Sequence, residues 1–183
     1  MHIMIDLETL STRGNAHILE IGAVCFDREK VDMTRSFSSF VGDQAGRHIE
    51  LSTVAWWMDA AGDAARKRIA LGMQTAPPLG SVLDALQRWV GLAEGLEGVW
   101  ARGAAFDMAI LRDAYAQYGF PSTPWKFRAE RDTRTLISLN PYLDEFKDLS
   151  EIRARETLGR PLIKHAALDD AVLEAHLIRT AVR

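Results

Sequence analysis

The sequence has little of what marks secreted, membrane or disordered proteins. Its one cysteine, Cys25, lies in the apolar run IGAVCF and cannot form an intrachain disulfide, so we expect a small buried side chain there. The stretch MHIMIDLETL has neither a basic region nor a long apolar segment, which predicts no signal peptide and no membrane span. No glycine, serine or glutamine tract indicates disorder. We therefore expect a globular, cytoplasmic protein.

The sequence also lacks an excess of positive charge. Its 22 Lys and Arg residues and 25 Asp and Glu residues give a net charge of -3 at pH 7. This balance argues against a broad surface that coats the phosphates of a duplex. Basic residues outnumber acidic ones in two short segments, 126–134 and 151–164, and such clusters are usually solvated faces. Any contact with nucleic acid is therefore expected to be local.

No internal repeat or linker divides the 183 residues, so we expect one domain over 1–183. Strand patterns at 2–7, 17–26 and 34–41 are separated by short turns, which predicts an antiparallel meander. Helical periodicity predicts helices over 79–92, 106–118 and 166–182, with a short strand at 98–101. This order predicts an α/β protein with a mixed sheet flanked by helices.

Two acids, Asp6 and Glu8, lie at the end of the first expected strand, which should be buried at the centre of the sheet. Residues i and i+2 of a strand point to the same face. Two adjacent carboxylates repel and lose hydration, so such a pair normally persists where a cation or a proton relieves it. A hard divalent cation would do so. The alternative is that the strand ends here and both acids point to water.

Two further acids stand near expected helix starts, where the helix dipole alone can favour them. Asp107 follows the short strand through the loop RGAAF, and Asp170 lies in HAALDD, five residues after His165. Asp169 is a rival for Asp170, because the two are adjacent and only one of them can face a common site. Taken singly, each of these acids is compatible with a structural role.

Taken together, these residues resemble a known pattern. The motifs DLET at 6–9, FD at 106–107 and HAALDD at 165–170 are similar to those of the DEDDh exonucleases of the ribonuclease-H-like fold. Within that group, WW at 56–57, GAAFD at 103–107, PW at 124–125 and RDTRT at 131–135 resemble a mycobacterial and phage exoribonuclease-like subfamily, itself similar to the nuclease domain of exonuclease VIII. One difference is WARG at 100–103, where that subfamily tends to read WGNG. Arg102 is therefore expected to alter how the substrate is bound.

The resemblance implies a five-stranded mixed sheet, in which three antiparallel strands are followed by parallel ones. It also implies a 3'–5' exonuclease that uses two Mg²⁺ or Mn²⁺ ions to release nucleoside 5'-monophosphates from RNA, and possible action on single-stranded DNA. Asp6 would bridge both ions, Glu8 and Asp170 would complete one site, and Asp107 would help to hold the second ion. His165 would be the general base, and its five-residue spacing selects Asp170 over Asp169.

Contacts with substrate are open to two interpretations. Thr9 could offer its hydroxyl or amide to the terminal nucleotide, or could simply form a turn. Adjacent residues do not face the same side of a helix, so at least one of Trp56 and Trp57 is expected near the cleft and the other in the core, and we assign Trp57 to substrate. Arg131 and Arg134 could contact phosphate or orient acids, or could form surface salt bridges.

Other functions remain open at this stage. The chain could be an exodeoxyribonuclease, a phosphodiesterase for dinucleotides, or a catalytically silent nucleic-acid-binding module. The preference between RNA and DNA depends on contacts to the 2'-hydroxyl that no short motif encodes. A homodimer is expected from family analogy and base rates.

Overall fold

The computed structural model describes residues 1–182, in which five strands form one mixed sheet of order β3-β2-β1-β4-β5. β1, β2 and β3 are antiparallel, and β4 and β5 continue the sheet in parallel from β1. This arrangement confirms the expected three antiparallel strands followed by parallel ones. The strands are β1 (His2–Thr9), β2 (Ile18–Phe26), β3 (Val31–Phe40), β4 (Gly98–Ala101) and β5 (Glu130–Asp132).

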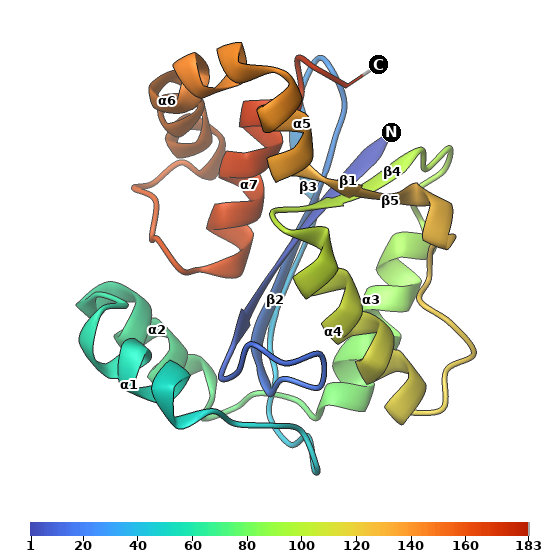
Figure 1. Cartoon of the computed structure of the whole chain (residues 1–183), viewed down its shortest axis with the longest axis vertical. Coiled ribbons are helices and arrows are strands. Elements are labelled where there is room, and N and C mark those ends of the chain that lie inside the picture. The colour runs from blue at the N-terminus through green and yellow to red at the C-terminus, as the bar shows by residue number, and fades with distance from the viewer. Residues whose placement is uncertain (183) are drawn as a thin grey trace.

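Helices cover both faces of the sheet, with α3 and α4 on one side and α6 and α7 on the other (Figure 1). None of the helices within residues 1–182 has the length and apolar character that crossing a membrane requires. The α-helices are α1 (Leu51–Asp59), α2 (Asp63–Gly72), α3 (Leu79–Gly91), α4 (Ala104–Gln117), α5 (Thr133–Leu139), α6 (Lys147–Leu158) and α7 (Ala167–Ile178), and the 3-10 helices are η1 (Phe127–Ala129) and η2 (Pro141–Phe146).

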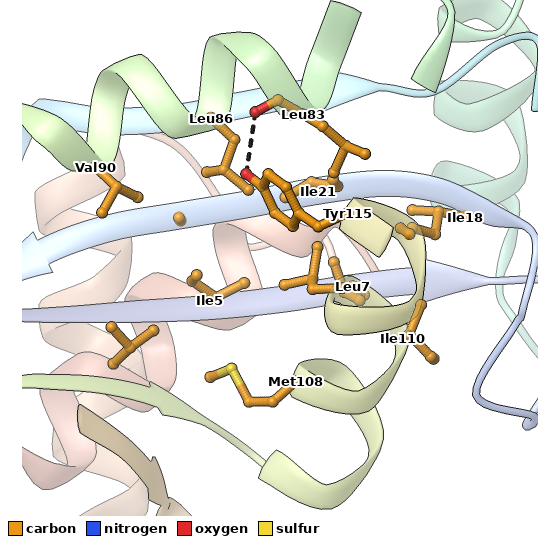
Figure 2. Close-up of a cluster of buried hydrophobic side chains, with 14 of the residues drawn as sticks. Ile5, Leu7, Ile18, Ile21, Leu83, Leu86, Val90, Met108, Ile110 and Tyr115 are labelled. Carbon is orange, nitrogen blue, oxygen red and sulfur yellow. Dashed lines mark hydrogen bonds between the residues drawn. The ribbon is translucent and has the colours of Figure 1, made fainter. Parts of the chain in front are cut away.

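β1 is the central strand and is buried on both faces. Ile5 and Leu7 point into the core formed with α3 and α4, where the Tyr115 hydroxyl donates a hydrogen bond of 3.0 Å to the Leu83 carbonyl (Figure 2). Met4 belongs to the other core, which is built around α7. Because side chains alternate along a strand, the even-numbered positions of β1 that follow Met4 face α7.

Several elements differ from the sequence-based expectation. The periodicity did not indicate α1, α2, α5, α6 or β5, because these are short or carry few buried side chains; only Ser150 and Ala154 are buried in α6. The last helix ends at Ile178 rather than at residue 182. Beyond it, the Arg179 guanidinium donates to the carbonyls of Arg28 and Glu29, which ties the chain to the β2–β3 turn.

Gly22 of β2 allows the start of α7 to lie directly on the sheet. It pairs with Asp6 of β1. A Cβ atom at Gly22 would stand 2.1 Å from the Leu168 nitrogen and 2.2 Å from the Ala167 carbonyl carbon, closer than real contacts allow. The distance between α7 and the centre of the sheet therefore depends on the absence of a side chain here.

Gly22→Ala should destabilise the fold, because the added methyl group must displace backbone atoms of α7 rather than a flexible side chain. We expect a loss of about 1–3 kcal/mol in the free energy of unfolding, the usual cost of overpacking. Gly91→Ala is the matched control, because a Cβ there meets nothing within 4 Å. Urea denaturation of both variants checks this, and equal stability of the two would contradict the proposed close approach.

Candidate active site

Asp6 and Glu8 lie on the face of β1 that is covered by α7. The strand continues to Thr9, and Glu8 is only 8% exposed. The alternative that the strand ends before the acids and leaves both in water is therefore wrong. β4 pairs with β1 only from His2 to Met4, so the half of β1 that carries the acids has no strand on that edge.

Asp107 occupies that open edge. It lies in the first turn of α4, as expected, and is 3% exposed. Its Oδ1 accepts a hydrogen bond of 3.2 Å from the Leu7 backbone nitrogen, which has no partner on β4. Asp107 therefore joins α4 to β1 beside the other two acids, and its role is more specific than that of a carboxylate that only complements the helix dipole.

Asp169 and Asp170, which are adjacent in the first turn of α7, have different partners. Asp169 is fully buried and accepts two hydrogen bonds of 2.6 Å from the Arg160 guanidinium and one of 2.8 Å from the Ile163 nitrogen. Asp170 accepts one hydrogen bond of 3.0 Å, from the His165 backbone nitrogen. Asp169 thus fixes the segment before the helix, while Asp170 remains directed toward β1.

The structure brings all five expected residues together. Glu8, His165 and Asp170 each contribute one side-chain atom that could bind a metal, a carboxylate oxygen or an imidazole nitrogen, and these three atoms lie within 4.8 Å of one another. Asp6 lines the same cavity as His165 and Asp170, and the charges of Asp107, Glu8 and Asp170 all raise its pKa. We call Asp6, Glu8, Asp107 and Asp170 the acid cluster.

Burial is the largest influence on the acid cluster. It raises the pKa of Asp6 well above the usual range of an aspartate, and it raises the pKa of Glu8 to about 8, of Asp107 to about 7 and of Asp170 to about 6. Neighbouring carboxylates add to the shifts of Asp6 and Glu8, whereas the hydrogen bond from Leu7 opposes the shift of Asp107. The ionised cluster therefore needs a balancing positive charge, and its hard oxygen donors suit divalent cations.

His165 has an unusual backbone conformation that aims its ring at the site. It is the one non-glycine residue within 1–182 with a positive φ, at 63°. Its ring packs edge-on against Trp56 and Trp57, with centroid distances of 4.9 Å and 6.2 Å. Burial, followed by the charge of Lys164, lowers the pKa of His165, so the imidazole is neutral at pH 7 and can accept a proton.

Two cavities flank the acid cluster. The tryptophan cavity, of about 430 Å³, contains Glu8 and is lined by Leu7, Glu8, Thr9, Thr12, Glu50, Ser52, Thr53, Trp56, Trp57 and Phe106. The α7 cavity, of about 420 Å³, is lined by Asp6, Arg102, Glu151, Leu162, Lys164, His165, Asp170, Leu173 and Glu174. Glu8 therefore borders one open space, and Asp6 and Asp170 border the other.

The two tryptophans differ in burial but share a location. Trp57 is 7% exposed and donates a hydrogen bond of 2.9 Å to the Thr9 carbonyl, whereas Trp56 is 41% exposed. Both rings line the tryptophan cavity and both contact His165. Trp57 also belongs to a buried hydrophobic cluster, so the expectation that one tryptophan lies near the cleft and the other in the core is confirmed. The Thr9 hydroxyl donates to the Ser11 carbonyl, at 2.8 Å, as in a turn.

Sequence reasoning missed two buried glutamates beside the site. Glu174 lies one helical turn after Asp170, accepts a hydrogen bond of 3.1 Å from the Thr133 hydroxyl and forms an ion pair with Arg102. Its charge raises the pKa of both Asp6 and Asp170. The i, i+4 spacing on the last helix could have indicated Glu174.

The second missed glutamate is Glu20 of β2, which pairs with Glu8 across the two strands. It is fully buried, forms an ion pair with Arg68 of α2 and accepts a hydrogen bond of 3.2 Å from the Ala167 nitrogen at the start of α7. A charged residue inside the apolar run HILEIGAVCF was the available signal. Glu20 is thus neutralised by the protein itself, unlike the acid cluster.

The two arginines considered from sequence differ in location. A Cβ atom at Gly103 would stand 3.3 Å from Nη1 of Arg134, and the charge of Arg134 lowers the pKa of Asp107. Arg131 is exposed, and its guanidinium donates to the Arg128 and Glu130 carbonyls. Arg134 therefore acts electrostatically on the acid cluster, whereas Arg131 is engaged with nearby backbone.

Comparisons with known proteins agree with this geometry. Residues 1–182 match the family model described as the 3'-5' exoribonuclease Rv2179c-like domain. No sequence among curated proteins aligns significantly with the chain.

Several solved structures share the fold. Cell-death related nuclease 4 (CRN-4) superposes with a TM-score of 0.61 and 16% identity, over 97% of this chain and 62% of that one. The nuclease domain of 3'hExo, a DEDDh family member bound to rAMP, has a TM-score of 0.61 and 16% identity, over 97% of this chain and 89% of that one. E. coli exonuclease I in complex with a dT13 oligonucleotide has a TM-score of 0.63 and 10% identity, over 98% of this chain and 41% of that one. This chain thus spans less than two thirds of CRN-4 and of exonuclease I.

The metal-free protein should lose stability as the pH rises from about 5.5 to 8.5. The folded pKa values of Asp170, Asp107 and Glu8, about 6, 7 and 8, lie above those of unfolded carboxyls. Between the unfolded pKa values, about 4, and these folded values, the folded state holds more protons, so its stability decreases with rising pH until each group has ionised in the folded state. Calorimetric melting in EDTA should show a falling Tm, and excess Mg²⁺ should reduce the fall. A metal-free Tm that rises over this interval would contradict the assigned electrostatics.

Proposed function

Because the chain belongs to the family of Rv2179c-like 3'-5' exoribonuclease domains, we propose that residues 1–183 form one exonuclease domain that removes nucleoside 5'-monophosphates from the 3' end of RNA. The observation that carries this proposal is the convergence of Glu8, His165 and Asp170 within 4.8 Å, beside Asp6 and Asp107. RNA is favoured by the family description and by the rAMP bound in the similar 3'hExo domain.

Asp6, Glu8, Asp107 and Asp170 would hold two divalent cations, Mg²⁺ or Mn²⁺. The raised carboxyl pKa values and the oxygen donor set support this assignment. When bound, the cations supply positive charge that stabilises the attacking and leaving oxygens of phosphodiester hydrolysis. The protein contributes rigid anchoring, because Leu7 holds Asp107 and the His165 backbone holds Asp170.

His165 would serve as the general base. Its lowered pKa leaves a ring nitrogen free to accept the proton of the attacking water, and the edges of Trp56 and Trp57 restrict the orientation of the ring. The left-handed backbone at His165 directs the side chain toward the cluster while its own nitrogen binds Asp170. One residue would therefore orient a metal ligand and move the proton.

The tryptophan cavity would receive the 3'-terminal nucleoside. Glu8 lies in its wall, so a nucleoside seated there places its phosphate next to the acid cluster. Trp56, which is 41% exposed, offers a ring for stacking, while Trp57 and Thr9 brace each other through their hydrogen bond. This division assigns direct stacking to Trp56 and places Trp57 and Thr9 in the wall of the cavity.

A 3'–5' exodeoxyribonuclease is the second candidate, because E. coli exonuclease I shares the fold and was solved with dT13. Matched single-stranded RNA and DNA substrates separate the two activities. We also propose a homodimer, on the general frequency of two-fold symmetric assemblies, and sedimentation velocity tests it.

Hydrolysis should proceed one nucleotide at a time from the 3' end and should require a divalent cation. A single-stranded RNA labelled at its 5' end should yield a descending ladder with Mg²⁺ or Mn²⁺ and no products in EDTA. Asp6→Asn should abolish turnover, because the variant loses the central carboxylate charge with little change in shape. Cleavage of a circular RNA, release from the 5' end, or unchanged hydrolysis in EDTA would overturn the proposal.

His165→Ala should lower single-turnover hydrolysis by about 100- to 10,000-fold, the range typical of general acid–base catalysis. Calorimetry should still detect metal binding, because the four carboxylates remain. The wild-type rate should fall as the pH drops through the lowered pKa of His165, and the variant should lack this limb. His17→Ala removes a histidine outside the site and serves as the control. A folded His165→Ala protein within a few-fold of wild type would refute the assigned base.

A further inference from the structure

A third cavity, of about 1130 Å³, lies between the C-terminal half of α3, the middle of α4 and the segment 121–128. It shares no lining residue with the two cavities beside the acid cluster. Its charged lining residues are all basic, namely Arg88, Arg112, Lys126 and Arg128, although the whole chain carries a net charge of -3. We propose that this α3–α4 groove binds the single-stranded part of the nucleic-acid substrate that lies upstream of the 3' end.

The groove holds cations in fixed and in free positions. Arg112 forms an ion pair of 2.7 Å with Glu130, whose other carboxylate oxygen accepts a hydrogen bond of 3.2 Å from Trp125. This network holds Arg112, whose side chain is 56% exposed, beside Trp125, and Arg88 likewise forms an ion pair with Asp84. Lys126 and Arg128 form no ion pair within residues 1–182, so their charges are available to a polyanion. Such uncompensated cations bind phosphates with release of counterions.

Phe127 adds an exposed aromatic ring to the groove, which the binding of phosphate alone does not require. The ring is 73% exposed and lies between Lys126 and Arg128 in sequence, with the Arg128 guanidinium 5.6 Å from its centroid. An exposed aromatic ring flanked by cations matches a base flanked by phosphates in a single strand. An acidic peptide would use the cations but would leave the ring without a base to stack on. The groove therefore favours single-stranded nucleic acid.

α4 connects the groove to the acid cluster. Asp107 and Arg112 are five residues apart on this helix, which corresponds to about 7.5 Å along its axis and about 140° around it. The groove thus lies on a different side of α4 from the acid cluster. Only a nucleic-acid strand longer than one nucleotide can occupy the active site and the groove at the same time. The inference rests on the proposed function for the identity of the polymer, but binding in the groove requires neither metal nor hydrolysis.

Fluorescence anisotropy with a labelled 20-nucleotide single-stranded RNA in EDTA tests the groove without hydrolysis. Phe127→Ala should raise the Kd about tenfold, and Phe127→Tyr should restore affinity because it retains a ring. The double variant Lys126→Gln/Arg128→Gln should weaken binding and lower the slope of log Kd against log salt by about 1.4, or about 0.7 for each lost phosphate contact. Arg28→Gln/Lys30→Gln, in the β2–β3 turn, removes the same charge outside the groove and should leave the Kd unchanged.

Three results would overturn the inference. One is an unchanged Kd for the 20-mer in both groove variants, and another is an equal loss of affinity in the β2–β3 control. The third is displacement of the RNA by polyglutamate at the same charge concentration, which would indicate an acidic protein partner. With Mn²⁺, the groove variants should also hydrolyse the 20-mer less efficiently relative to a dinucleotide. Absence of hydrolysis by every protein, with the binding differences intact, would refute the proposed function and leave the groove in place.

Discussion

Repulsion among buried carboxylates at the end of β1 is the constraint on which the rest of the site depends. β1 places Asp6 and Glu8 on one face, while α4 and α7 bring Asp107 and Asp170 to the same point. Burial raises the pKa of all four groups, and none of them forms an ion pair with a basic side chain within residues 1–182, so a proton or a cation must balance their charge. Glu20 and Glu174, close by, each have an arginine partner. The contrast separates charges that the fold compensates from charges left for a ligand.

The surrounding structure can be understood as the means of holding that cluster together. Gly22 lets α7 rest on the sheet, and Glu20 binds the first backbone nitrogen of that helix. On the opposite edge, β4 diverges after Met4 and leaves the Leu7 nitrogen for Asp107. Arg102, which was expected from sequence to alter substrate binding, lines the α7 cavity and forms an ion pair with Glu174. Its position gives it a structural partner as well as access to the site.

Much of the fold and of the site could be predicted from sequence. The order of the strand and helix patterns predicted a mixed sheet, which the structure confirms. The resemblance of the motifs around Asp6, Asp107 and Asp170 predicted an exoribonuclease-like subfamily, which the family match confirms. The spacing from His165 also selected Asp170 over Asp169, and the structure gives Asp169 a separate partner in Arg160. These features succeeded because they depend on local periodicity and short-range spacing.

What the sequence did not predict depends on contacts between distant segments. The meeting of Trp56 and Trp57 at His165 joins residues more than a hundred positions apart, and the ion pair between Glu20 and Arg68 requires the placement of α2. The groove around Phe127 is formed by three segments, of which 121–128 has no periodic pattern. The periodicity of a helix or a strand describes one element at a time and contains no information on contacts between distant elements.

The central claim, that the acid cluster is a divalent-metal site, is tested most directly by anomalous diffraction from crystals soaked in Mn²⁺. The account predicts two peaks about 3.5–4 Å apart among Asp6, Glu8, Asp107 and Asp170, and none at the arginine-paired Glu20 and Glu174. Loss of both peaks in Asp6→Asn crystals would show that the Asp6 carboxylate is needed to hold both ions. Saturating Mn²⁺ that gives no peak at the cluster, or peaks only at other carboxylates, would contradict the account.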